Sequence, residues 1–296
     1  MKSVLVALLL MLPVLNARAQ EAAPQTPLPP PPPTTEAPPV APPAVTTSPQ
    51  VATPGQAGAP GQEGAVKGYA VDIRRLSVAP KIDGKLDDVV WQEANLLDNF
   101  IQIEPLSGQP ATQRTEVRVG YDAENLYFGV RCFDSEPGKI VGSSRSADAS
   151  LASDDTISII LDTFHDRRNG FLFIVNPIGA KTDGLIRNEG EEVNTDWNGL
   201  WRAVTSRDSQ GWTAEIAIPF RTLRFPSGKA MQDWGFNVRR FVARTQESTL
   251  WRPIARRPGN LTPYLISEYG EIRGLSELGG SGGRYQLVPY GIARAG

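Results

Sequence analysis

Two tryptophans lie in a polar stretch of the sequence whose composition suits sugar binding. The run 194–201, Asn-Thr-Asp-Trp-Asn-Gly-Leu-Trp, combines flat aromatic rings with amide and carboxylate groups. Aromatic rings pack against the C–H faces of sugars, while planar polar side chains hydrogen-bond the hydroxyls. Other aromatic residues near polar groups extend the set. The candidate ligand-binding residues are Trp197, Trp201, Asn198, Asp196, Trp251 and Tyr264.

The same rings have a structural interpretation. Tryptophan is usually mostly buried in folded proteins, so Trp197 and Trp201 are equally suited to closing a hydrophobic core. An exposed aromatic pair flanked by amides would favour sugar binding. Burial of all the tryptophans would favour a structural role.

Three aspartates are candidate calcium ligands, because hard cations are bound by several carboxylate and carbonyl oxygens. Asp162, Asp166 and Asp183 would converge if the strands that carry them are adjacent. Aspartates in turns are also common without any metal. His165 is the only histidine, which excludes a zinc site built from several histidines. The sequence suggests no other cofactor.

No catalytic constellation stands out. Glycoside hydrolysis needs an acid and a base placed across the scissile bond, and no pair among the many carboxylates is singled out. The sequence contains no Gly-rich phosphate loop and no nucleophile elbow. With 30 Lys and Arg against 32 Asp and Glu, it also lacks the basic excess typical of nucleic-acid binding.

The elements that position these residues are predicted by a period-two alternation of apolar and polar side chains. In 115–121, Val117, Val119 and Tyr121 share one face, and in 126–133 every second residue is apolar. A polar turn joins the two runs, which predicts an antiparallel hairpin. Cys132 lies on the apolar face of this hairpin and is expected to be buried. As the only cysteine, it cannot form an internal disulfide.

Further short strands follow at regular intervals, separated by polar turns. This pattern predicts an all-β fold, an antiparallel, jelly-roll-like β-sandwich. Helical signals are weak and consist of a short helix over 87–94 and one turn near 219–223. The other predicted strands are 156–162, 171–176, 181–188, 200–207, 212–219, 235–243 and 267–273.

The regions that flank the predicted sandwich (71–278) differ in composition. Residues 1–19 resemble a signal peptide, with a short apolar run and small residues at positions 17 and 19. Residues 20–70 are rich in Pro and Ala, which predicts a disordered, extended linker. Residues 279–296 start with a Gly-rich break and continue as one alternating run without a partner strand in this sequence. We therefore expect export to the periplasm, the outer membrane or the cell surface.

Several motifs, taken in order, resemble family 9 carbohydrate-binding modules. They are Ile82-Asp83-Gly84-Lys85-Leu86-Asp87 with Trp91, the 115–130 hairpin, Asp155-Thr156-Ile157, the run 211–219, Trp234-Gly235-Phe236-Asn237 and Tyr269-Gly270. The resemblance spans about 81–275 and implies a sandwich in which Trp91, Trp212 and Trp234 are structural.

The resemblance also implies a sugar site made by two tryptophans supported by carboxylate, amide and Arg groups. The position of the first tryptophan falls at Ser150-Leu151-Ala152-Ser153, and that of an acidic residue falls at Ser158. The position of the second falls at 261–264, where Tyr264 is the one aromatic residue.

The runs 161–170 and 176–179 are similar to a bacterial subgroup in which this module precedes an outer-membrane β-barrel. That resemblance implies that 285–294 is the first barrel strand and that the chain continues beyond residue 296. A barrel needs at least about eight strands.

Three functions therefore compete. The first is non-catalytic binding of a polysaccharide or oligosaccharide, in the service of polysaccharide catabolism. The second is a structural or gating domain that acts on the barrel and binds no sugar. The third is a glycoside hydrolase, which requires two carboxylates that face each other across a cleft.

Overall fold

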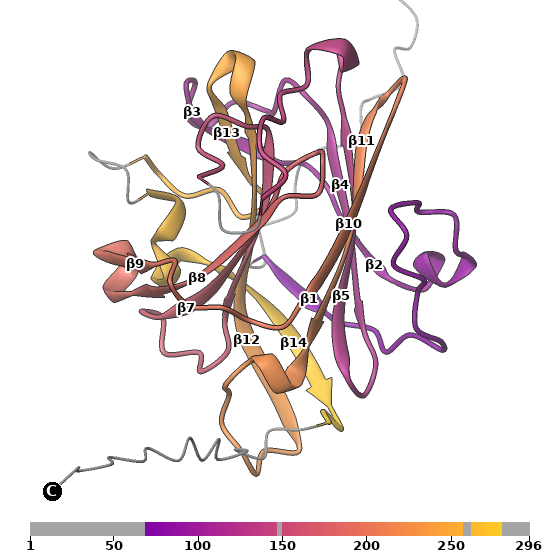
Figure 1. Cartoon of the computed structure of the whole chain (residues 1–296). Coiled ribbons are helices and arrows are strands. Elements are labelled where there is room, and N and C mark those ends of the chain that lie inside the picture. The colour runs from indigo at the N-terminus through magenta and orange to yellow at the C-terminus, as the bar shows by residue number, and fades with distance from the viewer. Residues whose placement is uncertain (1–68, 147–149, 257–261, 280–296) are drawn as a thin grey trace, which may run out of the picture. The chain divides into compact units, whose positions relative to one another are not determined.

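The computed structural model describes residues 69–146, 150–256 and 262–279 of the chain. These residues form two β-sheets packed face to face (Figure 1), which confirms the predicted β-sandwich. The predicted signal peptide, nearly all of the predicted linker and the predicted strand after Gly283 lie outside the described residues. Within the described ranges, no helix is long and apolar enough to cross a membrane.

The larger sheet has the strand order β1-β14-β12-β6-β7-β8-β9, and β13 pairs with both β12 and β3. Only the pairing of β1 with β14 is parallel among these strands. Its strands are β1 (Ala70–Asp72), β3 (Ile101–Glu104), β6 (Thr156–Asp162), β7 (Gly170–Val175), β8 (Lys181–Arg187), β9 (Glu192–Asn194), β12 (Met231–Val242), β13 (Glu247–Leu250) and β14 (Gly270–Ser276).

The smaller sheet is antiparallel throughout, in the order β10-β11-β5-β4-β2. The predicted hairpin lies in this sheet, since β4 pairs with β5 in antiparallel orientation. Its strands are β2 (Asn95–Leu97), β4 (Thr115–Tyr121), β5 (Asn125–Phe133), β10 (Arg202–Asp208) and β11 (Gly211–Pro219).

The helices of the described residues are all single 3-10 turns. The helix predicted over 87–94 is the short turn η1, and the predicted turn near 219–223 is η4. These turns are η1 (Val89–Gln92), η2 (Pro137–Lys139), η3 (Asn188–Gly190), η4 (Phe220–Thr222), η5 (Ala243–Thr245), η6 (Thr262–Tyr264) and η7 (Ile266–Glu268).

The main core lies between the sheets, where the inward residues of both meet. Trp212 and Trp234 are fully buried there, as expected for structural rings. A second apolar cluster lies on the opposite face of the larger sheet, where Leu172 and Ile160 pack against Ile266 of η7. Strand β6 is therefore buried on both faces, and this cover leaves only part of the outer face open.

The first motif of the family resemblance, Ile82 to Asp87 with Trp91, is called the opening motif. It is held to the outer face of the smaller sheet by one buried carboxylate. Glu215, on β11, is completely buried and accepts hydrogen bonds from Trp91 Nε1 and from the backbone N–H groups of Asp83 and Gly84, each at 2.8 Å. Gly84 has a φ of +89°, and a Cβ there would lie 3.1 Å from the Thr205 carbonyl, so glycine is required. Burial raises the pKa of Glu215, while these three donors favour its charged form.

The two sheets are joined at one end by a buried arginine. Arg240 points inward from β12, and its guanidinium donates to the carbonyls of Gln113, Arg114 and Phe133 and to Thr115 Oγ1. All four acceptors lie in or beside β4 and β5 of the other sheet. Such a charge is tolerable because these bonds satisfy its terminal nitrogens, although the buried Nε has no partner among the described residues.

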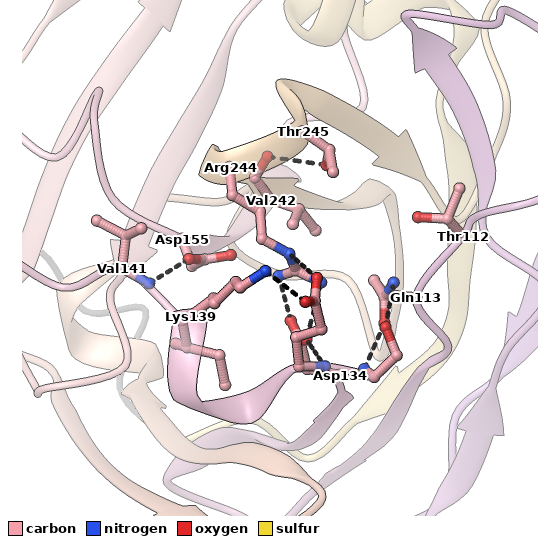
Figure 2. A network of polar contacts seen from close by, with 12 residues as sticks. Thr112, Gln113, Asp134, Lys139, Val141, Asp155, Val242, Arg244 and Thr245 are labelled. Carbon is pink, nitrogen blue, oxygen red and sulfur yellow. Dashed lines mark hydrogen bonds and ion pairs between the residues drawn. The ribbon is translucent and has the colours of Figure 1, made fainter.

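A second arginine reinforces this junction. Figure 2 shows Arg244, in η5, reaching Asp134, which follows β5. The two side chains form a bidentate pair at 2.7 and 2.8 Å, and the carboxylate of Asp134 is fully buried. We call Arg240, Arg244 and Asp134 the inter-sheet clamp.

We predict that Glu215→Gln lowers the free energy of unfolding by roughly 1–3 kcal/mol, because an amide nitrogen would then face one of the three N–H donors. The change is measured as a shift of the urea midpoint at constant m-value. Glu191→Gln, at an exposed position, is the control. Equal midpoints for the two variants would show that Glu215 does not anchor the opening motif.

Cys132 provides a probe of the core. It is fully buried, and burial raises the pKa of its thiol to about 11. We therefore expect a thiol reagent at neutral pH to label the full-length protein only at the rate of unfolding, and at once in denaturant. Rapid stoichiometric labelling of the native protein would contradict this packing.

Candidate functional site

A pocket of about 450 Å³ opens on the face of the larger sheet that points away from the main core. This volume is within the range of natural ligand pockets. The floor consists of residues from four neighbouring strands, and the walls come from three segments that are distant in sequence. The lining residues are Thr156, Ser158, Ile174, Thr182, Arg239 and Phe241 on the floor, and Ser150, Leu151, Ala152, Thr195 and Tyr264 on the walls.

The floor is one cross-strand row of side chains. Arg239 on β12 pairs with Ser158 on β6, Ser158 pairs with Ile174 on β7, and Ile174 pairs with Thr182 on β8. Residues directly opposite one another on a sheet project from the same face. The row therefore presents the Arg239 guanidinium next to the Ser158 hydroxyl, and Ile174 separates Ser158 from the Thr182 hydroxyl.

Arg239 is the charged group of the pocket floor, and it is half-buried. Its Nε donates to Ser248 Oγ at 2.7 Å, and its guanidinium lies 5.3 Å from the centre of the Phe241 ring. These contacts hold the side chain in place without using its terminal nitrogens. Burial lowers the pKa of Arg239, although an arginine remains charged at neutral pH.

Two aromatic rings lie beside the polar side chains of the pocket, one on the floor and one on a wall. Phe241 is next to Thr156 across the strands β12 and β6, and Tyr264 projects from η6. Tyr264 packs closely on η3, where a Cβ at Gly190 would lie 2.7 Å from the Tyr264 Cβ. The absence of a side chain at Gly190, whose φ is +88°, thus permits the position of this ring.

A polar network supports the wall formed by 150–152. Asp154 accepts hydrogen bonds from Ser143 and, at 2.7 Å, from Asn176 Nδ2. The Asn176 Oδ1 in turn accepts the N–H groups of Ile178 and Ala180 in the β7–β8 turn. Burial opposes ionisation of Asp154, but these donors hold its pKa below the ordinary value. The run 176–179 is thus a structural connection next to the pocket.

Trp197 and Trp201 are placed on the core side of the larger sheet. Trp201 is buried and donates its Nε1 to Asp183 Oδ1 at 3.0 Å. The half-buried Trp197 packs against Phe171 and Phe173, which face the main core. Asp183 also accepts the Gly199 N–H, so this carboxylate draws 199–201 towards the core. Trp197 and Trp201 therefore do not form an exposed aromatic pair, and both rings extend the core.

The other predicted ligand residues separate into two groups. Trp251 is buried against Phe236 and Tyr69 in the main core. Asp196 and Asn198 are exposed and do not line the pocket, although their neighbour Thr195 does. Of the six predicted ligand residues, only Tyr264 lines the pocket.

The three aspartates predicted as calcium ligands are not brought together. Asp162 and Asp166 share the β6–β7 turn, where Asp162 accepts backbone N–H groups of Asp166 and Arg167, and Asp166 accepts those of Arg168 and Asn169. Asp183 instead binds Trp201 and Gly199. The described part of the chain holds no group of three or more His, Cys, Asp or Glu side chains arranged for a metal ion.

Several pocket residues are missed by inspection of the motifs alone. Arg239 and Phe241 lie on the polar-looking side of β12, and Thr156 lies on that side of β6. The alternation of β6 did leave Ser158 opposite its core residues, and the family resemblance marked Ser158, 150–153 and Tyr264 as site positions. The structure brings representatives of all three segments to one pocket.

Comparisons with known proteins agree with this architecture. Residues 82–250 match the family model described as carbohydrate family 9 binding domain-like. No curated protein matches the chain significantly.

Three solved structures are similar to it. A putative carbohydrate-binding protein from Bacteroides uniformis ATCC 8492 has 10% identity and a TM-score of 0.56, over 70% of this chain and 99% of that one. A family 9 carbohydrate-binding module from Caldicellulosiruptor kristjanssonii, in complex with cellotriose, has 18% identity and a TM-score of 0.48 over 75% and 100%. The complex of a family 9 module from the same organism with glucose has 17% identity and a TM-score of 0.49, over 74% of this chain and 100% of that one.

At such low identity, the similarity to the Bacteroides protein shows a shared fold only. The family model is stronger evidence, because it covers more than half of the 296 residues. The chain therefore belongs to the carbohydrate family 9 binding domain-like family.

Proposed function

We propose that this protein is a non-catalytic glycan-binding protein and that its sugar binds in the pocket on the outer face of the larger sheet. The observation that carries the proposal is the composition of the pocket. It combines the rings of Tyr264 and Phe241 with the hydroxyls of Thr156 and Ser158 and the guanidinium of Arg239. Aromatic faces with a few oriented polar groups are what sugar recognition requires.

Family membership supports the same assignment. The pocket is lined by residues at all three places where the resemblance to family 9 modules locates sugar-binding groups, namely 150–152, Ser158 and Tyr264. The solved family 9 module that resembles this chain was studied in complex with cellotriose and with glucose. The aromatic contribution here is smaller than two tryptophans would give, so single-sugar affinity should be modest.

The burial of the tryptophans bears on the competing functions. The burial of Trp201 and the packing of the half-buried Trp197 on the core argue against this pair as a binding platform, which by itself would favour a purely structural domain. The pocket provides a separate platform, which restores the case for binding. Glycoside hydrolysis requires two opposed carboxylates, and the described residues that line the pocket include none.

We also propose that the protein is exported and that its sandwich precedes an outer-membrane β-barrel, serving polysaccharide capture at the cell envelope. The N-terminal apolar run with small residues at 17 and 19 supports export. The alternating run 285–294 and the similarity of 161–170 to the barrel-containing subgroup support the second part.

For the sugar site, we predict that Tyr264→Ala weakens retention on a glycan array by about tenfold, because one ring face is lost from the pocket. Phe164→Ala is the matched control, since Phe164 is exposed and lies outside the pocket. Because Tyr264 also packs on η3, binding is measured under conditions in which circular dichroism shows both variants to be folded. If Tyr264→Ala binds every glycan as the unmodified protein does, the pocket is not the sugar site.

For export, we predict that the protein expressed at full length in a Gram-negative host starts at Gln20, as measured by mass spectrometry of the envelope fraction. Ala19→Asp should block processing, because a signal peptidase requires a small residue there. Recovery of the unmodified protein with an intact Met1 to Gln20 segment in the cytoplasm would refute export.

A further inference from the structure

The electrostatics of the pocket are one-sided. Arg239 contributes a positive charge, and none of the described residues that line the pocket is acidic. The strand position opposite Arg239, where the family resemblance implies an acidic residue, is Ser158. A charge in a partly buried pocket is normally compensated, because desolvation is costly when it is not.

Arg239 has no compensating partner elsewhere in the described part of the chain. No carboxylate there forms an ion pair with it, and its one hydrogen bond uses Nε and leaves both terminal nitrogens unused. The Glu104 carboxylate attracts Arg239 from a distance, but it is paired with Arg256 at 3.4 Å. Among the described residues, the positive charge of Arg239 is therefore left without a partner and can meet a ligand.

The guanidinium is also held in position for a ligand. Its Nε is fixed by Ser248, and its plane is steadied by the Phe241 ring, so the two terminal nitrogens remain as a preorganised fork. Such a fork matches the two oxygens of a carboxylate, and it binds them with charge-assisted hydrogen bonds. A neutral hydroxyl would use only part of this capacity.

We propose that the pocket prefers acidic glycans and that the carboxylate of a uronic acid binds to the terminal nitrogens of Arg239. The hydroxyls of Thr156 and Ser158 flank this group, and Tyr264 offers a ring face to the same sugar. The inference rests on the proposed function, because it assigns the class of sugar to the proposed site.

The experiment uses the full-length chain and matched pairs of ligands. Oligomers of galacturonate, glucuronate and mannuronate are each compared with the carboxyl-reduced oligomer, in which every –COO⁻ is replaced by –CH₂OH. We expect at least one acidic oligomer to bind about tenfold more tightly than its reduced counterpart, and the advantage to decrease as salt increases.

Three variants test the role of Arg239. Arg239→Gln should abolish the preference for the acidic member of the pair, while Arg239→Lys should keep part of it. Ser158→Asp leaves the arginine in place but supplies a carboxylate opposite it, and should also abolish the preference. Arg202→Gln is the control, because it removes the same charge from an exposed position on β10 in the other sheet and should leave binding unchanged.

The outcomes separate this inference from the proposed function. Equal or tighter binding of the reduced oligomers by the unmodified protein would overturn the acidic preference and leave glycan binding intact. An acidic preference that survives Arg239→Gln in a folded protein would also overturn it. Binding of no oligomer from either class, on a broad glycan array as well, would overturn the proposed function itself.

Discussion

The inter-sheet clamp is the interaction on which the rest of the structure depends. Arg240 is 1% exposed, and its guanidinium satisfies carbonyls of the opposite sheet, so β12 can occupy only one register between its neighbours. Side chains alternate along a strand, and a slip of one residue would exchange the two faces of β12. With Arg240 fixed inward, Arg239 and Phe241 must face outward into the pocket.

These adjacent arginines illustrate two uses of one chemical group. Arg240 is buried and donates four hydrogen bonds to the other sheet, and Asp134 lies 3.8 Å away. Arg239 is anchored through Nε alone and keeps its two terminal nitrogens unused among the described residues. The first arrangement stabilises the sandwich, because the terminal nitrogens of Arg240 are paired with groups of the opposite sheet. The second suits recognition, because the missing partner is left for a ligand.

The aromatic residues are divided in a similar way. Trp201 extends the core because Asp183, on the inward face of β8, accepts its indole N–H and the nearby backbone. Trp91 is held under the opening motif by Glu215. The rings that remain near the open face of the larger sheet are the smaller ones, Phe241 and Tyr264. A pocket with less aromatic surface has to rely more on its polar contacts, which increases the importance of Arg239.

The sequence by itself determined the class of fold, because alternation along the long strands is a local property. The hairpin of β4 and β5, the strand β6 and the buried Cys132 all follow from period-two patterns. The shortest strands, such as β2 and β9, are three residues long, which is too short for the alternation to be detected. The order of the motifs along the chain also indicated the family, but the sequence does not show why the opening motif and the run 211–219 occur together. That reason is tertiary, since the buried carboxylate of Glu215 joins two motifs that lie more than a hundred residues apart.

Only the tertiary structure decided which residues form the candidate site. A tryptophan in a polar run has the same local sequence pattern whether it is exposed or packs on the core. Trp201 packs on the core because its indole N–H donates to Asp183, which lies on β8. Likewise, Arg239, Ser158 and Tyr264 share no local pattern, because cross-strand pairing and the packing of η6 on η3 bring them together. Alternation specifies two faces for each strand. Which face is covered by the other sheet, and which keeps an open pocket, depends on contacts between residues distant in the sequence.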